Sequence, residues 1–128
     1  MRENITLIYV TMRTAIERWE GGVFIVDTGS SSTIVAPLLI TRLGLSVPAN
    51  APRKPIHLLG GQKIEVPFIR VDAIRVGQAT LESVEVGVYE VAPEAPAIEG
   101  VLGGDFLHHF RVTIDKAAGR MQLEPLTR

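Results

Sequence analysis

Short segments in which every second residue is apolar recur along the chain, and they constrain its fold more than any other feature. Val84, Val86 and Val88 alternate with polar or small residues, and Val112 and Ile114 do the same. Successive side chains of a strand point to opposite faces, so this spacing is typical of strands that are buried on one face. Many short strands with little helix predict an all-β fold, either a small sandwich or a closed barrel.

Other segments extend this pattern. Further strand candidates are rich in Ile, Val and Phe and cover residues 4–12, 22–27, 63–73 and 121–124. Two segments look helical: 37–43 begins with a proline and stops before a glycine, and 105–110 is long enough for one or two turns. Paired prolines predict loops at 48–52 and 93–96, because proline lacks the backbone donor that helices and ladders use. We expect residues 1–128 to form a single domain.

Composition excludes several kinds of partner. The chain has 128 residues, of which 46% are hydrophobic, and this suits one folded unit with a sizeable core. The formal net charge is −1 and no run of Lys or Arg occurs, so neither nucleic acid nor an anionic membrane is an expected partner. The absence of cysteine excludes disulfides and thiolate sites and favours the cytoplasm. The apolar stretch 5–10 is far shorter than the roughly 20 residues that cross a bilayer.

A carboxylate follows one of the predicted strands directly. The apolar run 23–26 leads into Asp27-Thr28-Gly29, and three serines occupy residues 30–32. A turn tightened by glycine and tied down by hydroxyl groups would hold the Asp27 side chain rigidly at the end of a buried strand. Turns after strands favour Asp and Gly for backbone reasons alone, so the tripeptide by itself is more typical of an ordinary turn. Other parts of the chain have to decide between the two interpretations.

A pair of glycines marks a hairpin. Gly60 and Gly61 lie between residues 56–59 and 62–66, which both have the composition of strands. Adjacent glycines accept positive backbone φ angles without steric cost, so they suit the tip of a hairpin. The pattern therefore predicts two antiparallel strands that meet at these glycines.

Two apolar residues and a glycine, Val101-Leu102-Gly103, precede the second helix candidate and two closing strand candidates. The Asp-Thr-Gly turn, the first helix candidate with its Leu-Gly ending, the hairpin and this motif follow one another along the chain. In that order they resemble the retropepsin-like aspartic proteases, which are single-lobed relatives of pepsin. The resemblance covers residues 22–124, which is nearly the whole chain.

The resemblance implies a small closed barrel with one or two short helices, and it assigns roles by position. Asp27 is the catalytic residue that it implies. Thr28, Gly29 and Ser30 support the catalytic loop: Thr28 locks the loops of two chains together, Gly29 lets a substrate backbone approach, and the Ser30 hydroxyl lies beneath the carboxylates and can bond one of them. No cofactor is implied.

The resemblance also implies which residues surround the substrate, an extended peptide or protein. Leu59, Gly60 and Gly61 form the flap that closes over it. Val101, Leu102 and Gly103 pack beside the catalytic loop. The apolar candidates for the pocket walls are Ile56, Leu58, Val101 and Leu102.

The chemistry explains why a homodimer is expected. Peptide hydrolysis without a metal or a covalent intermediate needs one group to take a proton from water and another to give a proton to the scissile carbonyl. Two carboxyl groups held close together can do this, because they share one proton rather than both ionising. The other aspartates, Asp72, Asp105 and Asp115, lack the Thr-Gly that follows Asp27. The second carboxyl group must therefore come from Asp27 of a twofold-related chain.

Two interpretations besides an aspartic endopeptidase stay open. One is a catalytically inactive retropepsin-like domain that binds peptides or dimerises, since a fold does not fix a function. The other is an unrelated small barrel that binds a small molecule. A metal site is not expected, because His108 and His109 are adjacent and would point about 100° apart on a helix. A serine nucleophile is not expected at residues 30–32 either, because these serines lack both the Gly-x-Ser-x-Gly pattern and an accompanying base.

Overall fold

The described chain is mostly extended. The computed structural model describes residues 6–14, 17–58, 61–115 and 117–126. The strands in these ranges are β1 (Leu7–Arg13), β2 (Trp19–Val26), β3 (Ile34–Val35), β4 (Arg53–His57), β5 (Lys63–Val76), β6 (Ala79–Val88), β7 (Ile98–Leu102), β8 (Phe110–Asp115) and β9 (Arg120–Pro125). The helices are α1 (Pro37–Arg42) and α2 (Gly104–Leu107). Both helices fall where the sequence predicts helical turns.

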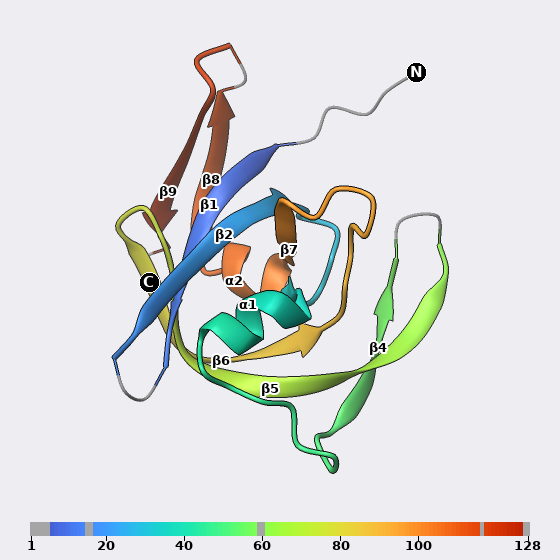
Figure 1. The fold of residues 1–128 in the computed structure, drawn as a ribbon. Coiled ribbons are helices and arrows are strands. Elements are labelled where there is room, and N and C mark those ends of the chain that lie inside the picture. The colour runs from blue at the N-terminus through green and yellow to red at the C-terminus, as the bar shows by residue number, and fades with distance from the viewer. Residues whose placement is uncertain (1–5, 15–16, 59–60, 116, 127–128) are drawn as a thin grey trace.

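Six of the strands close into a barrel (Figure 1). Their hydrogen-bonded order is β1-β2-β7-β3-β6-β5, and β5 pairs back with β1 from Thr11↔Arg75 to Arg13↔Ala73. The pairs β2–β7 and β3–β6 are parallel, whereas the others are antiparallel. Closure of the ring pairs strand edges that an open sheet would expose. The predicted small closed barrel with two short helices is therefore confirmed.

The predicted hairpin stands at one side of this barrel (Figure 1). Strand β4 pairs with the first part of β5, from Arg53↔Pro67 to His57↔Lys63. The tip lies between these strands, and Gly61 there has a φ of +88°, which glycine accepts without strain. Residues 59 and 60 lie outside the described residues, so the predicted positions of Leu59 and Gly60 in the flap stay predictions.

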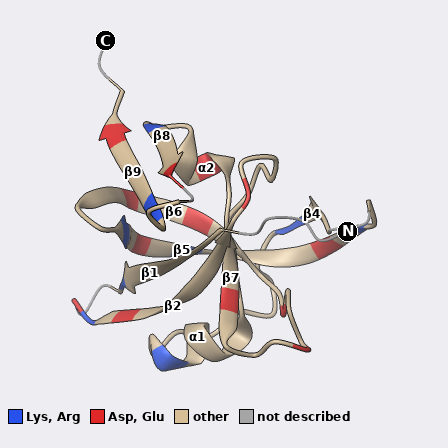
Figure 2. Cartoon of the chain, turned by 90° about the horizontal axis from the view of Figure 1, so that it is seen from above, with Lys and Arg blue, Asp and Glu red and all other residues tan. Residues whose placement is uncertain are grey.

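The barrel is filled by one large apolar core and one smaller cluster. The largest fully buried side chains of the main core include Met12, Phe24, Leu39, Ile74 and Phe106. Burial of each such side chain contributes roughly 1.5–3 kcal/mol to folding. Figure 2 shows α1 and α2 on opposite sides of the barrel strands, and both helices place buried residues in the main core. The smaller cluster lies where the hairpin meets the barrel and contains Ile34, Ile56, Val66 and Phe68.

Strands β8 and β9 form a separate two-stranded hairpin. Val112, Met121 and Leu123 are partly buried and pack against the main core, so one face of the hairpin covers the barrel. Acidic and basic residues are distributed around the molecule without a continuous stretch of one sign (Figure 2). Within the described part of the chain, neither helix has the length and apolar character needed to span a membrane.

Some predicted boundaries are wrong. The helix expected over 105–110 is α2, which ends at Leu107, because the chain turns there and Phe110 begins to pair with Pro125. The strand expected over 63–73 continues to Val76, where it can still pair with Ala79. Strand β7 was not predicted, since glycine interrupts its apolar pattern. That glycine, Gly100, leaves room for the Phe24 ring, which a Cβ atom would overlap.

Candidate active site

The main chain fixes Asp27 on both sides. Its amide N–H donates to the carbonyl oxygen of Leu102 at 3.0 Å, which extends the β2–β7 pairing by one residue beyond β2. The amide N–H of Gly29 donates to Oδ1 of Asp27 at 3.0 Å, and that of Ser30 donates to the Asp27 carbonyl at 3.1 Å. A side-chain oxygen that accepts from the residue two places on is a tight turn of the kind Asp favours. The Asp27 carboxylate is thus held at the end of β2 and is half-buried.

Behind this turn lies a buried polar network. Thr33 is fully buried, and its amide N–H donates to Oδ2 of Asp105 at 2.9 Å, while its hydroxyl donates to Oδ1 at 2.6 Å. The same Thr33 hydroxyl accepts a hydrogen bond from the Gly103 amide at 3.1 Å, and the Phe106 amide donates to Asp105 Oδ1 at 2.8 Å. Bonds to a charged acceptor are stronger than neutral ones. The network therefore joins the loop after β2 to the start of α2.

The glycines after β7 allow this junction to be close. A Cβ atom on Gly103 would overlap the backbone carbonyl of Ser32, and a backbone group cannot move aside as easily as the end of a flexible side chain. The Gly104 amide donates to the Ser30 carbonyl at 2.6 Å. Both glycines are buried, so the two loops pack backbone against backbone at this point. Leu102 is also fully buried and packs in the main core.

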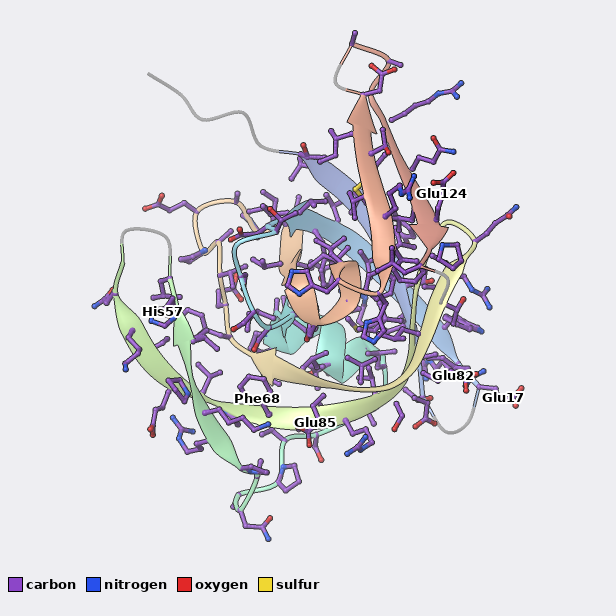
Figure 3. The ribbon with its side chains drawn as sticks, turned by 180° about the vertical axis from the view of Figure 1, so that it is seen from behind. Glu17, His57, Phe68, Glu82, Glu85 and Glu124 are labelled. Carbon is purple, nitrogen blue, oxygen red and sulfur yellow. The ribbon has the colours of Figure 1, made fainter. Side chains whose placement is uncertain are left out.

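A cleft with a volume of about 490 Å³ opens in front of Asp27. Residues from β2 and the loop after it, β3, the β4–β5 hairpin, β7 and the segment after β6 line it: Ile25, Asp27, Gly29, Ser30, Ser31, Ser32, Ile34, Ile56, His57, Leu58, Tyr89, Glu90, Val91, Pro93 and Val101. Figure 3 shows His57 at the end of β4, beside the hairpin tip. The cleft is large enough to hold several side chains of an extended peptide.

Three of the four apolar residues predicted as pocket walls lie at this cleft, and their contact with a substrate stays a prediction. Ile56, Leu58 and Val101 line the cleft. Leu102 does not, because it alternates with Val101 and points to the opposite side of β7, into the core. The segment after β6, which contributes Tyr89 and Glu90 among others, was missed because it is an irregular loop with no periodic pattern.

The three residues after Asp27 differ in their surroundings: Ser30 is half-buried, whereas Thr28 and Gly29 are exposed. The Ser30 hydroxyl donates to the carbonyl oxygen of Ser32 at 2.9 Å, so the expected bond to a carboxylate is absent from the described chain. Ser30 has a nearby carbonyl acceptor within its own turn, and its single proton is used there. Thr28 and Gly29 are both exposed, and no hydrogen bond of the Thr28 hydroxyl occurs among the described residues.

Two ion pairs join elements that border the site. Arg42 of α1 donates to both carboxylate oxygens of Glu99 in β7, at 2.6 and 2.8 Å, and to the Gly21 carbonyl at 2.9 Å. These bonds raise the pKa of Arg42. Lys54 of β4 donates to Glu85 of β6 at 2.8 Å, and this bond lowers the pKa of the Glu85 carboxyl. Strand β7 and the hairpin are thereby tied to their neighbours.

Comparisons with known proteins agree with this geometry. Residues 20–106 match the family model described as aspartyl protease. A retropepsin-like aspartic protease from Rickettsia conorii, known from a crystal structure, superposes with a TM-score of 0.56 at 16% sequence identity. The match covers 90% of this chain and 92% of that chain. A search among curated proteins gave no match.

The barrel, the Asp-Thr-Gly turn and the adjoining glycine loop define a retropepsin-like aspartic protease fold. Because the family model spans more than half of the sequence, this chain belongs to the aspartyl protease family.

Proposed function

We propose that this chain is an aspartic endopeptidase that acts as a homodimer, with one Asp27 from each chain in the active site. The observation that carries the proposal is the Asp27 carboxylate, which main-chain hydrogen bonds fix at a cleft of about 490 Å³. Asp105 cannot be the second catalytic group, because it is occupied by the network around Thr33. Glu90 lines the same cleft, but no hydrogen bond joins it to Asp27 in the described chain.

A twofold axis beside Asp27 would complete the site. In an isologous dimer the same surface of each chain meets its copy, so the two Asp27 carboxyl groups would face each other. Such a pair retains one shared proton, and aspartic proteases are the standard example of this behaviour. The ionised Asp27 would take a proton from water while the water oxygen attacks the scissile carbonyl carbon. The protonated Asp27 of the other chain would give its proton to the carbonyl oxygen.

The tetrahedral intermediate then has two hydroxyl groups on one carbon. Collapse re-forms the carbonyl bond and breaks the bond to the peptide nitrogen, which receives a proton as it leaves. The released proton of the second hydroxyl returns to the carboxylate pair, so the site regains its starting state. Each step uses the same two carboxyl groups, one as acid and the other as base.

The exposed side of the loop supports an approach from outside the chain. A Cβ atom on Gly29 would touch only Oδ1 of Asp27, at 3.5 Å, which is an ordinary contact, and Gly29 does not have a positive φ. The single chain therefore has no need of glycine at this position. A close-packed partner or a substrate backbone does account for it. The exposed Thr28 hydroxyl is likewise available to a second chain, as the family resemblance implies.

The hairpin supplies the proposed cover over the substrate. An extended peptide can pair with the edge of a strand, which gives main-chain hydrogen bonds that do not depend on sequence. Closing Leu59, Gly60 and Gly61 over the peptide would exclude water from the reaction. Positive φ at Gly61 is compatible with a tight tip. The apolar side chains of Ile56 and Leu58 would then face substrate side chains.

The test compares the wild-type chain with Asp27→Asn in cleavage of an unstructured polypeptide from acidic to neutral pH. We expect the variant to lose activity by about a thousandfold, the scale of acid–base catalysis, and a statine transition-state analogue to inhibit the wild type. Asp115→Asn is the matched control, because Asp115 is exposed and lies outside the cleft. Equal activity of Asp27→Asn and wild type would overturn the assignment.

Sedimentation at several protein concentrations tests the dimer separately. Active protein should sediment as a dimer, and dilution that yields monomer should remove activity. An active monomer would contradict the shared site. Wild-type protein that binds peptides but never cleaves them would instead indicate the peptide-binding domain described above.

A further inference from the structure

The segment after β6 contributes a wall of the cleft to which no motif assigns a role. Tyr89, Glu90, Val91 and Pro93 all line the cleft, and Glu90 is the only acidic residue there besides Asp27 among the described residues. We propose that Glu90 makes the enzyme selective for substrates with a Lys or Arg side chain in the pocket beside it. This inference rests on the proposed function and specifies its substrate class.

The backbone holds Glu90 in a defined position. The amide N–H of Tyr89 donates to the carbonyl of Val35 at 3.0 Å, which continues the pairing of β6 with β3 up to the residue before Glu90. Beyond it, the chain turns twice, with hydrogen bonds from Ala95 to Ala92 at 2.9 Å and from Ile98 to Ala95 at 2.8 Å. Glu90 is therefore placed by a strand on one side and an ordered turn on the other.

The surroundings of Glu90 suit the stem of a basic side chain. Tyr89 and Val91 are half-buried and pack against the smaller apolar cluster that includes Ile34 and Ile56. Lys and Arg side chains lay their methylene groups along such surfaces and keep the charged group at the polar end. An aromatic ring near the site adds a weak attraction for a cation. A basic residue of the substrate would thus meet an apolar wall first and a carboxylate beyond it.

The charge balance of the cleft also favours a cation. The lining residues that can be charged near neutral pH are Asp27, Glu90 and His57, so with a neutral imidazole and both carboxyl groups ionised the formal charge of one chain's cleft is −2. No Lys or Arg lies within ion-pairing distance of Glu90 among the described residues. A half-buried carboxylate without a cationic partner gains by meeting one, whereas an acidic substrate residue would be repelled.

The experiment uses sets of three peptides that share one apolar core. In each set, one position near the scissile bond carries Lys, Gln or Glu, and each such position is varied in turn. Wild-type protein should cleave the Lys peptide about tenfold faster, as kcat/KM, than the Gln peptide at one or more of these positions, which is the scale of one charged hydrogen bond. Glu90→Gln should bring the two rates together. The Glu peptide should be the slowest with wild type.

Glu94→Gln is the matched control, because Glu94 lies in the same loop but is exposed and outside the cleft. It should keep the preference for Lys, and added salt should weaken that preference. Wild-type protein that cleaves the Lys and Gln peptides equally would leave the endopeptidase in place and overturn the selectivity. So would a preference that survives in Glu90→Gln.

Equilibrium binding of the same peptides separates this inference from the proposed function. If wild-type protein cleaves none of them, fluorescence anisotropy should still give about tenfold tighter binding of the Lys peptide than of the Gln peptide, and Glu90→Gln should remove the difference. That result would overturn the endopeptidase and support the role of Glu90. Equal binding of all peptides, or no binding, would overturn the role of Glu90.

Discussion

The two sides of the Asp27 loop differ in how many of their polar groups have hydrogen-bond partners within the chain. On the inner side, Thr33 is buried and its amide and hydroxyl both have partners on Asp105 or Gly103. On the outer side, Thr28 and Gly29 are exposed, and the described chain offers the Thr28 hydroxyl no hydrogen bond. The chain therefore builds the support of the loop by itself and leaves the outer side exposed, where the proposed partner chain or substrate would bind. Substitutions on the two sides should separate stability from activity.

The largest loss of stability should follow from removing the inner anchor. Asp105→Ala leaves the buried amide and hydroxyl of Thr33 without their acceptor, whereas the Phe106 amide keeps the Gly103 carbonyl, so the free energy of unfolding should fall by about 3 kcal/mol. Urea denaturation measures this change. Asp115→Ala is the control, because Asp115 is exposed and accepts only from the Ala118 amide, and it should change stability by less than about 0.5 kcal/mol. Similar losses of unfolding free energy in both variants would contradict the conclusion that the bonds of Asp105 anchor the loop.

Two glycine substitutions compare the sides directly. Gly103→Ala should cost about 2 kcal/mol, because its Cβ would push against the Ser32 backbone. Gly29→Ala should change stability by less than about 0.5 kcal/mol, since its Cβ meets only an ordinary contact. Its cleavage activity should nevertheless fall about a hundredfold, because a displaced substrate or partner misaligns the carboxylates. Unfolding curves and kcat/KM on one peptide measure both effects.

The opposite pattern would show that the exposed side also stabilises the single chain. A large loss of stability in Gly29→Ala, or full activity in that variant, would contradict the division between support and reaction.

A smaller loss of stability is expected when the ion pair between Arg42 of α1 and Glu99 of β7 is removed. Arg42→Met removes two hydrogen bonds to Glu99 and one to Gly21. Because the Arg42 side chain is 40% exposed, solvent screens the pair, and the loss should be only about 1 kcal/mol. Thermal unfolding measures it, with Arg53→Met as a control that loses a single exposed bond to the Glu65 carbonyl. A loss as large as that of Asp105→Ala would show that the support of the loop extends to α1.

The smallest effect concerns the pH dependence of the hairpin. The hydrogen bond from Lys54 lowers the pKa of Glu85, so the ionised carboxyl is favoured in the folded chain. Its stabilising contribution is present above the ordinary pKa of glutamate and is lost as the pH falls through the lowered value. NMR titration of Glu85 should show the lowered pKa in the wild type and a return toward the ordinary value in Lys54→Met. An unchanged titration would mean that the pair does not persist in solution.

The sequence predicts the parts of the site that follow periodic strands or contain glycine motifs. The turn at Asp27, the hairpin and the glycine after Leu102 each have a local reason that single-sequence patterns can express. The anchor between Thr33 and Asp105 has none, because its partners are 72 residues apart and come together through the pairing of β3 with β7. The one local sign of this anchor in the sequence is that a threonine, Thr33, stands directly before the apolar residues Ile34 and Val35.

The wall that includes Tyr89 and Glu90 could not be predicted for a similar reason. This segment has neither a strand period nor a helical one, and its place beside the cleft follows from the parallel pairing of β3 with β6. Parallel pairs join distant segments, which a local pattern does not reveal. Strand β7 was missed for a local reason, because Gly100 interrupts its apolar pattern, whereas the neighbouring strand β2 was predicted.

The bond between Thr33 and Asp105 also has a consequence for the order of folding. Asp27 is synthesised before the groups that fix its loop, because these come from β7 and the start of α2, later in the chain. Contacts of such long sequence separation form late, after the intervening strands have paired. Until those segments are made, a nascent chain therefore carries the Asp-Thr-Gly residues without the contacts that hold the loop in place. In the proposed endopeptidase, topology alone would delay assembly of the catalytic loop until α2 has been made.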